Sequence, residues 1–382
     1  SLSPTMCILA LSLCEHPLLP VALVFNRDER KERPTDRAAF YADSGLLFGR
    51  DQLSGGSWLG LNTRTGVVVA LTNHDSSVED VVSVPSDRVP ISRGRLVRAV
   101  LDRPPTQLRE GLRDWHRYAG FQLLAMSVFD EQPTALAFTN RPHTDTLVQQ
   151  PSVSSGSTVL MQHPERGDEY EHGAESAVHS HAKTAVLGKP RCTPFVEYHA
   201  PTTISFSNGS LFEEDTGGPK VAALRRHMAD LMARLPRDRE AMVLRVDHSV
   251  PVDTIQVVGV APEHERYEQL RDLGRSVLVS RFIEEACVIL CRSDLFEADG
   301  IRPLSYFLPN VYASAEELFA CQQIFVKGEE WVTRSQTMVL RIENQAVVFL
   351  ERNTYPNFTE WLRFVVPIDA AASAGAASTP SS

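Results

Sequence analysis

The chain has 382 residues, of which 43% are apolar and 23% charged, so it is long enough to bury a large core in one or two domains. It holds 38 Lys and Arg against 48 Asp and Glu, a net charge of −10, and shows no basic run. Because phosphate binding rests on a basic face, this balance argues against nucleic acid as a partner.

Targeting and redox signals are weak in this sequence. No apolar run reaches the roughly 18 residues that a membrane-spanning helix needs. The apolar stretch from Met6 to Leu13 has no basic segment before it and ends at Glu15 and His16, so it does not read as a signal peptide. The six cysteines are sparse and irregularly spaced, which indicates mostly free thiols and a reducing compartment. We therefore expect a cytoplasmic protein.

The first predicted elements are two strands, Met6 to Leu13 and Val21 to Phe25, separated by a break at Glu15-His16-Pro17. Two strands with so short a connection pair antiparallel. That pairing sets the start of the first strand beside the end of the second. Hairpin geometry alone therefore places Cys7 next to Asn26, Arg27 and Asp28.

Further short strands follow at Leu46 to Gly49, Trp58 to Asn62 and Val67 to Thr72, the last ending at Asn73. This is a run of antiparallel hairpins and not a βαβ pattern. A helix from Ser92 to Leu101 comes next, with Ser92 as its N-cap. The segments Phe121 to Phe129 and Thr134 to Phe138 then form another predicted strand pair.

The second half of the chain is less regular. A polar stretch at about 141–183, rich in His, Ser and Gly, reads as an insertion, and residues 369–382 as a disordered tail. Thr202 to Ser207 is a strand, and Pro219 to Leu235 is an amphipathic helix. Residues 236–304 and 306–319 show no clear pattern. The predicted domain, spanning 6–368, closes with a hairpin of Thr333 to Ile342 and Ala346 to Glu351.

A series of short motifs carries a family resemblance, which runs from Met6 to about Arg352. The motifs are Met6-Cys7, Asn26-Arg27-Asp28-Glu29, Gly49-Arg50-Asp51, Gly55-Gly56-Ser57-Trp58-Leu59-Gly60, Ala70-Leu71-Thr72-Asn73, Ser92-Arg93-Gly94, Gly120-Phe121, Ser207-Asn208, Pro219-Lys220-Val221, Thr333-Arg334-Ser335-Gln336-Thr337 and Glu351-Arg352. In this order they resemble the NRDE family, also called the transport and Golgi organisation protein 2 family. The order of so many motifs makes the resemblance specific.

The resemblance implies an α+β fold, a four-layer αββα sandwich of two stacked antiparallel sheets, like that of the N-terminal-nucleophile hydrolases. In those enzymes the residues ahead of a cysteine are removed, the thiol attacks an amide, and the freed α-amine acts as the base. Ser1 to Met6 precede Cys7 here. A free amine on Cys7 therefore requires their removal.

Six site residues are implied by the resemblance. Cys7 matches the nucleophile, Arg27 the arginine beside it, and Asp28 the carboxylate that orients the amine. Asn73 and Asn208 match oxyanion donors at strand ends, and Arg334 matches a second arginine. The predicted hairpin supports Cys7, Arg27 and Asp28 independently, whereas the other three stand only at the edges of predicted strands.

Two functions follow as alternatives. The first is a factor for Golgi organisation, protein secretion, haem trafficking and lipid homeostasis, associated with the Golgi or the mitochondrion. Its ligand would be a small molecule, a lipid or haem. No cofactor is required, and haem would be a cargo. The second is a cysteine-dependent amidohydrolase that cleaves a linear amide bond. The sequence does not predict an oligomeric state.

Simpler interpretations stand beside these. Cys7 could be a small buried residue at the start of a strand. Arg27 and Asp28 could form a structural ion pair. The dipeptide Asn208-Gly209 is also typical of a turn. Cys287 and Cys291, four residues apart, fit core packing. We expect no metal site, because the spacings of the histidines in the insertion match no zinc pattern; these are His163, His172, His179 and His181.

Overall fold

The computed structural model describes residues 7–73, 91–103, 107, 118–140, 157–160, 195–207, 219–293, 316, 320–321 and 323–368. The predictions for Met6, Asn208, the tail and the insertion apart from 157–160 lie outside these residues. Within the described ranges, no helix is long and apolar enough to cross a membrane.

The first sheet has seven strands and contains both ends of the described chain. Its order is β11 (Thr202–Ser207), β1 (Ile8–His16), β2 (Leu19–Arg30), β13 (Trp331–Ile342), β14 (Ala346–Asn353), β15 (Leu362–Pro367) and β12 (Ile255–Val257). Only the β12–β15 pair is parallel among these described strands. The two predicted hairpins, β1–β2 and β13–β14, are confirmed, with Ile8 opposite Asn26 and Ile342 opposite Ala346.

The second sheet is antiparallel throughout its described strands. Its order is β3 (Thr35–Tyr41), β4 (Leu46–Asp51), β5 (Leu59–Asn62), β6 (Val67–Asn73), β7 (Phe121–Ser127), β8 (Ala135–Thr139), β10 (Phe195–Tyr198) and β9 (Ser157–Leu160). The run of hairpins from β4 to β8 agrees with the sequence prediction. Strand β9 lies inside the predicted insertion, and it pairs with β10 at the edge of the sheet.

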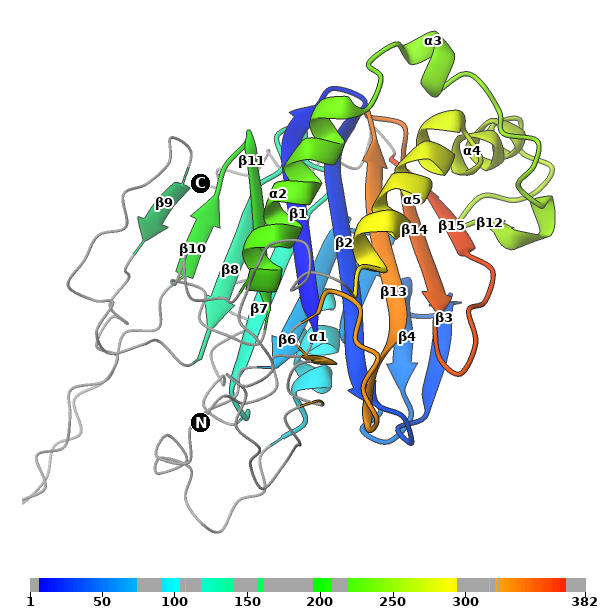
Figure 1. Ribbon diagram of the computed structural model, residues 1–382. Helices are drawn as coiled ribbons and strands as arrows, with labels where there is room; N and C mark the ends of the chain where they lie inside the picture. Colours follow the sequence, from blue (N-terminus) through cyan, green and yellow to red (C-terminus); the bar gives the residue numbers. More distant parts are fainter. Residues whose placement is uncertain are drawn as a thin grey trace, which may run out of the picture.

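Apolar side chains sort into three layers because successive residues of a strand point to opposite faces. Along β13, Met338 and Leu340 pack under the helices, whereas Val339 between them packs between the sheets. Helices α2 (Pro219–Arg234), α3 (Arg239–Met242), α4 (Arg266–Gly274) and α5 (Val277–Leu290) cover the first sheet, and α1 (Arg93–Leu101) covers the second (Figure 1). The αββα sandwich predicted from the resemblance is therefore confirmed.

The region 236–304, whose sequence shows no clear pattern, contains three of the described helices. Helices α3, α4 and α5, a short 3-10 turn at Val252–Thr254 and strand β12 all fall within it. Ser276 caps α5 by accepting a hydrogen bond from the Val279 amide at 3.4 Å. Ser92 precedes α1 as predicted, but its side chain makes no cap hydrogen bond.

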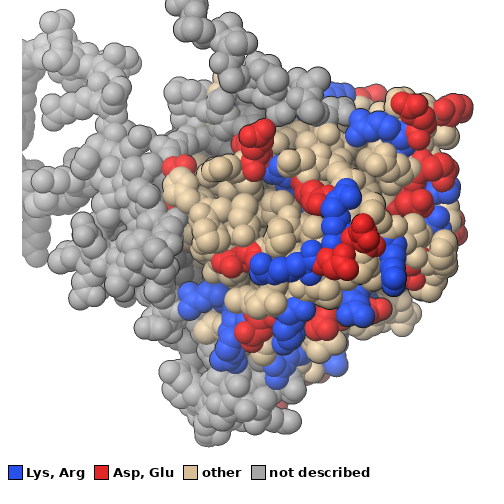
Figure 2. All heavy atoms as spheres, turned by 90° about the horizontal axis from the view of Figure 1, so that it is seen from above, with Lys and Arg blue, Asp and Glu red and all other residues tan. Residues whose placement is uncertain are grey.

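Figure 2 views the molecule from above Figure 1 and shows acidic and basic side chains interspersed on the described part of that face. The ion pairs at the surface include Arg239 with Glu343 and Arg234 with Glu285. Because such exposed ion pairs stabilise little, the sandwich depends mainly on its apolar layers.

Two hydroxyl groups connect β6, β11 and the start of β1 at one end of the sandwich. Thr72 Oγ1, at the end of β6, donates to the Ser207 carbonyl at 3.1 Å. Ser207 Oγ, at the end of β11, donates to the Cys7 carbonyl at 2.8 Å. These buried bonds hold the start of β1 against the second sheet.

Candidate active site

A pocket of about 270 Å³ opens where these strands meet. The ends of β2, β4 and β6 contribute to its wall, and the residues just before α1 close one side. The lining residues are Cys7, Arg27, Asp28, Glu29, Arg33, Asp51, Ser54, Ser57, Trp58, Leu71, Asn73, Ile91, Ser92, Arg93, Gly94 and Ala119.

Cys7 lies in the pocket wall immediately before β1 and is only 7% exposed. Its thiol donates to the Asp28 carbonyl, with 3.5 Å between sulfur and oxygen. Burial and the nearby Asp28 charge raise the pKa of the Cys7 thiol to about 12. The thiol is therefore protonated at neutral pH, and a nucleophilic role requires a base inside the pocket.

Asp28 presents a buried carboxylate beside this cysteine. Its Oδ1 accepts a hydrogen bond from Thr333 Oγ1 at 2.6 Å, whereas no described residue donates one to the buried Oδ2. Burial raises the pKa of Asp28 to about 6, against the opposing influence of the Lys220 ammonium, the Thr333 hydroxyl and the Arg27 guanidinium. An unsatisfied buried oxygen is costly and calls for an explanation.

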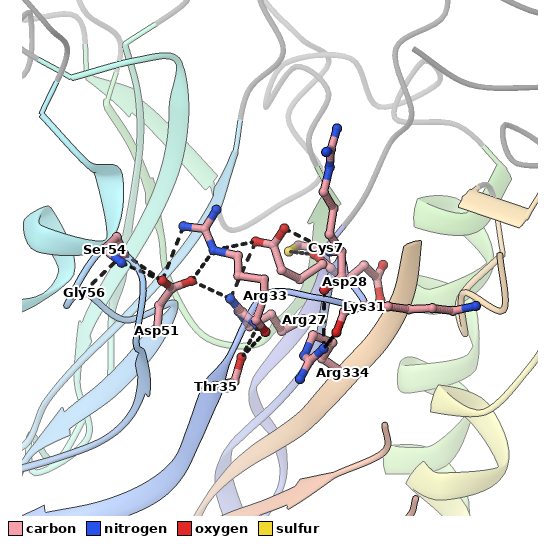
Figure 3. A network of polar contacts seen from close by, with 12 residues as sticks. Cys7, Arg27, Asp28, Lys31, Arg33, Thr35, Asp51, Ser54, Gly56 and Arg334 are labelled. Carbon is pink, nitrogen blue, oxygen red and sulfur yellow. Dashed lines mark hydrogen bonds and ion pairs between the residues drawn. The ribbon is translucent and has the colours of Figure 1, made fainter. Parts of the chain in front are cut away.

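Arg27 lines the same pocket as Cys7, and several contacts fix its position. Its Nη2 donates to Asp51 Oδ2 at 2.7 Å, and its Nη1 donates to Thr35 Oγ1 at 2.9 Å. The guanidinium also stacks over the Trp58 ring, 4.5 Å from the ring centroid. Figure 3 shows the contacts of Arg27 with Asp51 and Thr35. Together with the Trp58 ring, they leave the side chain little freedom.

Asp51 joins Arg27 to a second arginine at the pocket mouth. Arg33 Nε donates to the same Asp51 Oδ2 at 2.6 Å, and the Ser54 amide donates to Oδ1 at 2.9 Å. Burial raises the pKa of Asp51, but these hydrogen bonds and both guanidinium charges outweigh burial and hold it below its usual value. The network is therefore ionised at neutral pH.

The structure places the six predicted site residues unequally. Cys7, Arg27, Asp28 and Asn73 all line the pocket, Asn73 from the end of β6. Arg334 does not line it: a bulge in β13 leaves Arg334 between the pairs Thr333–Asp28 and Ser335–Arg27. There it donates to the Arg30 and Lys31 carbonyls and stacks on Tyr355. Asn208 lies outside the described residues.

Several polar residues of this site were not chosen from the sequence. Arg33, Asp51 and Arg93 occur in or beside the quoted motifs but have no local pattern that marks them as functional. Lys220 did carry a signal. It falls on the same helical stripe as Leu224, Met228 and Leu231, all buried, so an amphipathic pattern would place this lysine in the core.

Within the described part of the chain, no cluster of three or more His, Cys, Asp or Glu side chains could hold a metal ion. The histidines of the predicted insertion lie outside those residues. None of the five described cysteines forms a disulfide bond within the described residues. The polar groups of the pocket supply a thiol, a buried carboxylate and a fixed arginine, a set suited to nucleophilic acyl chemistry.

Comparison with known proteins adds one match. The family model described as Transport and Golgi organisation 2 matches residues 6–356, nearly the whole chain. A separate search of curated proteins found no match.

Proposed function

The chain belongs to the Transport and Golgi organisation 2 family, and we propose that it serves this family role by cysteine-dependent hydrolysis of a small linear amide. The proposal makes Cys7 the nucleophile of an N-terminal-nucleophile hydrolase site, after removal of the residues through Met6. The proposal combines two parts. The role in transport and Golgi organisation comes from the family, and the reaction is the one that the polar groups of the pocket favour.

The unsatisfied Oδ2 of Asp28 is the observation that carries the proposal. Asp28, whose main-chain carbonyl accepts from the Cys7 thiol, has a buried carboxylate oxygen that lacks a donor among the described residues. A free α-ammonium on Cys7 would supply both a donor and a positive charge there. Such charge-assisted bonds are short and strong, so the amine would remove the cost of the orphan oxygen.

The steps of the reaction balance without a cofactor. The neutral α-amine of Cys7 takes the thiol proton, and the thiolate attacks the amide carbonyl carbon. Asn73 is the proposed donor to the oxyanion, with Asn208 in the same role by resemblance. The C–N bond breaks, the amine product leaves with the proton, and an acyl thioester remains on Cys7. Water then releases the carboxylic acid and restores the thiol.

Two measurements test this proposal on the natural protein. Intact mass spectrometry should give a mass that begins at Cys7, and an extended or blocked terminus would sink the mechanism. The protein is then incubated with N-acyl amides of increasing chain length while primary amine release is followed. A Cys7→Ala variant is the control and should release none. Trapping of an acyl adduct on the Cys7 peptide would support the covalent step.

The family resemblance also implies specific roles, which remain expectations: Golgi organisation, protein secretion and the handling of haem or lipid. For haem, the pocket offers little support, because about 270 Å³ lies just below the roughly 300–1,000 Å³ of typical ligand pockets. Titration with haem at micromolar protein, followed by its absorbance band, tests the carrier function. The amide-hydrolysis proposal expects no saturable band shift.

A further inference from the structure

Lys220 is a buried cation in an unfavourable position. It lies in the first turn of α2 and is 0% exposed. Lysine is almost never fully buried unless it is paired. The first turn of a helix also carries the positive end of the helix dipole, which disfavours a cation. Both effects require a compensating anion close to the ammonium group.

Asp28 is the anion that meets this requirement. The Lys220 ammonium is anchored by donating to the Cys321 carbonyl at 3.0 Å. Asp28 exerts the largest charge effect on Lys220, ahead of Cys321 and Cys7, and Lys220 in turn is the strongest influence that lowers the pKa of Asp28. Helix α2 packs on β1 and β11, and the Val221 carbonyl, next to Lys220 in the chain, accepts a hydrogen bond from Ser205 Oγ of β11 at 2.7 Å.

We propose that Lys220 is a positioning residue for the Cys7 site: its buried ammonium group keeps the Asp28 carboxylate charged, so that Asp28 can hold the amino group of Cys7. The consequence for catalysis rests on the proposed function, whereas the charge pairing does not. The lysine touches no reacting atom in this scheme, and it acts through Asp28.

The other charged groups around Asp28 do not replace Lys220. Arg27 and Glu29, on the same strand, act on Asp28 with opposite signs. The Arg27 guanidinium is already bound to Asp51 at 2.7 Å. Thr333, on the neighbouring strand, contributes a neutral hydroxyl. An ionised Asp28 therefore depends mainly on the cation that α2 brings to it.

A double-mutant cycle in the full-length chain tests the pair, with Lys220→Met, Asp28→Asn and the double variant. At about pH 8 each single variant should lower Tm by roughly 5–10 °C, because each leaves one buried charge unpaired. The double variant should lose much less than the sum. Should Lys220→Met fail to fold while the double variant folds, that result also supports the pair.

The pH dependence distinguishes charge pairing from simple packing. Asp28 in the native chain is mostly protonated at about pH 5 and ionised at about pH 8, since burial raises its pKa to about 6. The Tm loss of Lys220→Met should therefore grow between these pH values, because the carboxylate that needs the ammonium forms only at the higher pH. The losses of Asp28→Asn and of the double variant should not grow, since both lack that carboxyl group. Lys327→Met, at an exposed lysine, is the matched control and should change Tm at neither pH.

Additive losses, or a Lys220→Met loss equal at both pH values, would overturn the proposal. The cycle needs no hydrolysis, so it fails separately from the proposed function. If the Tm losses of Lys220→Met and Asp28→Asn are coupled but the native chain cleaves no amide, the Lys220–Asp28 pair is established and the proposed hydrolase function is refuted. In a chain that does cleave amides, Lys220→Met should lower kcat at least tenfold near neutral pH and leave KM nearly unchanged.

Discussion

Asp51 accepts hydrogen bonds from two arginines of the pocket, and its loss should therefore cost stability. An Asp51→Asn change removes the negative charge between Arg27 and Arg33 while keeping the side-chain shape. Arg27 is only 4% exposed, so its guanidinium would keep Glu29, at 3.5 Å, as its remaining acidic partner. We expect the free energy of unfolding to fall by about 2–4 kcal/mol, measured by urea denaturation at neutral pH.

The matched control for this change is Asp43→Asn, at an exposed position. It should alter the free energy of unfolding by less than about 0.5 kcal/mol. Because the pKa of Asp51 is held below its usual value, the difference between the two variants should shrink as the pH falls through the acid range. Equal losses for both variants would show that Asp51 does not organise the pocket.

Glu351 is a second buried carboxylate, located on β14 behind the pocket, and it predicts a pH effect. It accepts hydrogen bonds from the Ala38 amide and the Thr337 hydroxyl. Burial raises its pKa from 4.5 to about 7, more than these bonds and the nearby arginines lower it. The folded state thus holds a proton that the unfolded state releases, and stability falls as pH rises from about 4.5 through 7.

Glu351→Gln removes this proton binding and keeps an acceptor for the Ala38 amide. We expect the variant to match the native chain at about pH 5 and to exceed its free energy of unfolding by up to about 3 kcal/mol at about pH 8. Urea denaturation across this pH range measures the difference. Glu131→Gln, at an exposed site, should show no such divergence. A variant that is less stable at the higher pH would contradict the prediction.

Residues at this site differ in how far the sequence revealed them. The hairpin brought Cys7 to Arg27 and Asp28 by local geometry alone, and the pairing of Ile8 with Asn26 confirms that arrangement. Arg334 could not be placed in the same way. Its position depends on a bulge between two strands about 300 residues apart, and one added residue redirects a side chain.

At the scale of elements, close backbone contact holds helix α1 against the pocket. A Cβ atom on Gly56 would lie 2.4 Å from the Gly94 carbonyl carbon, and the Ser57 amide donates to the Gly94 carbonyl at 3.1 Å. Gly56→Ala should therefore displace the start of α1 and lower the free energy of unfolding by about 2–3 kcal/mol. Because Ser92 to Gly94 line the pocket, alkylation of Cys7 by iodoacetamide should also become faster.

Gly55 offers a matched comparison in the same turn. Its φ is +69°, but a Cβ atom there would meet nothing closer than 3.8 Å. Gly55→Ala should cost only the backbone strain, about 1 kcal/mol, and leave the Cys7 alkylation rate unchanged. If Gly55→Ala accelerates alkylation as much as Gly56→Ala does, contact with α1 is not the cause.

Elements whose apolar residues repeat with a regular period were predictable from the sequence. Elements buried against more than one neighbour were not. Helix α2 has one buried stripe, and the period of its apolar residues matched the structure. Helix α5 reads Val-Leu-Val-Ser-Arg-Phe-Ile, rich in β-branched and aromatic residues that favour strands. Burial against the sheet and α2 overrides that preference. Strand β3 is not recognisable from the sequence because it begins with polar residues and is interrupted by a bulge after Asp36.

At the scale of the whole molecule, strand order was beyond local reasoning. The hairpin β13–β14 pairs through β13 with β2, a strand near the start of the chain. Nothing in the period of either segment specifies this, because any exposed strand edge offers the same hydrogen-bonding groups. The layered architecture was predictable only through the ordered motifs of the family. From that architecture one can infer that a core lies between the sheets, but not which residues form it.

Substitutions on β14 test the packing of that inter-sheet core. Phe349 on β14 is fully buried between the sheets and packs edge to face on Phe364, with 6.3 Å between ring centroids. Its neighbour Leu350 is equally buried but lies under the helices. Phe349→Ala should lower the free energy of unfolding by about 3–5 kcal/mol, and Leu350→Ala by about 2–5 kcal/mol, through cavities on opposite faces of one strand. Val288→Ala, at a site 71% exposed, should cost less than about 0.5 kcal/mol. Urea denaturation of the three variants checks both layers together. A Phe349→Ala loss no larger than that of Val288→Ala would mean that the two sheets do not share a packed core.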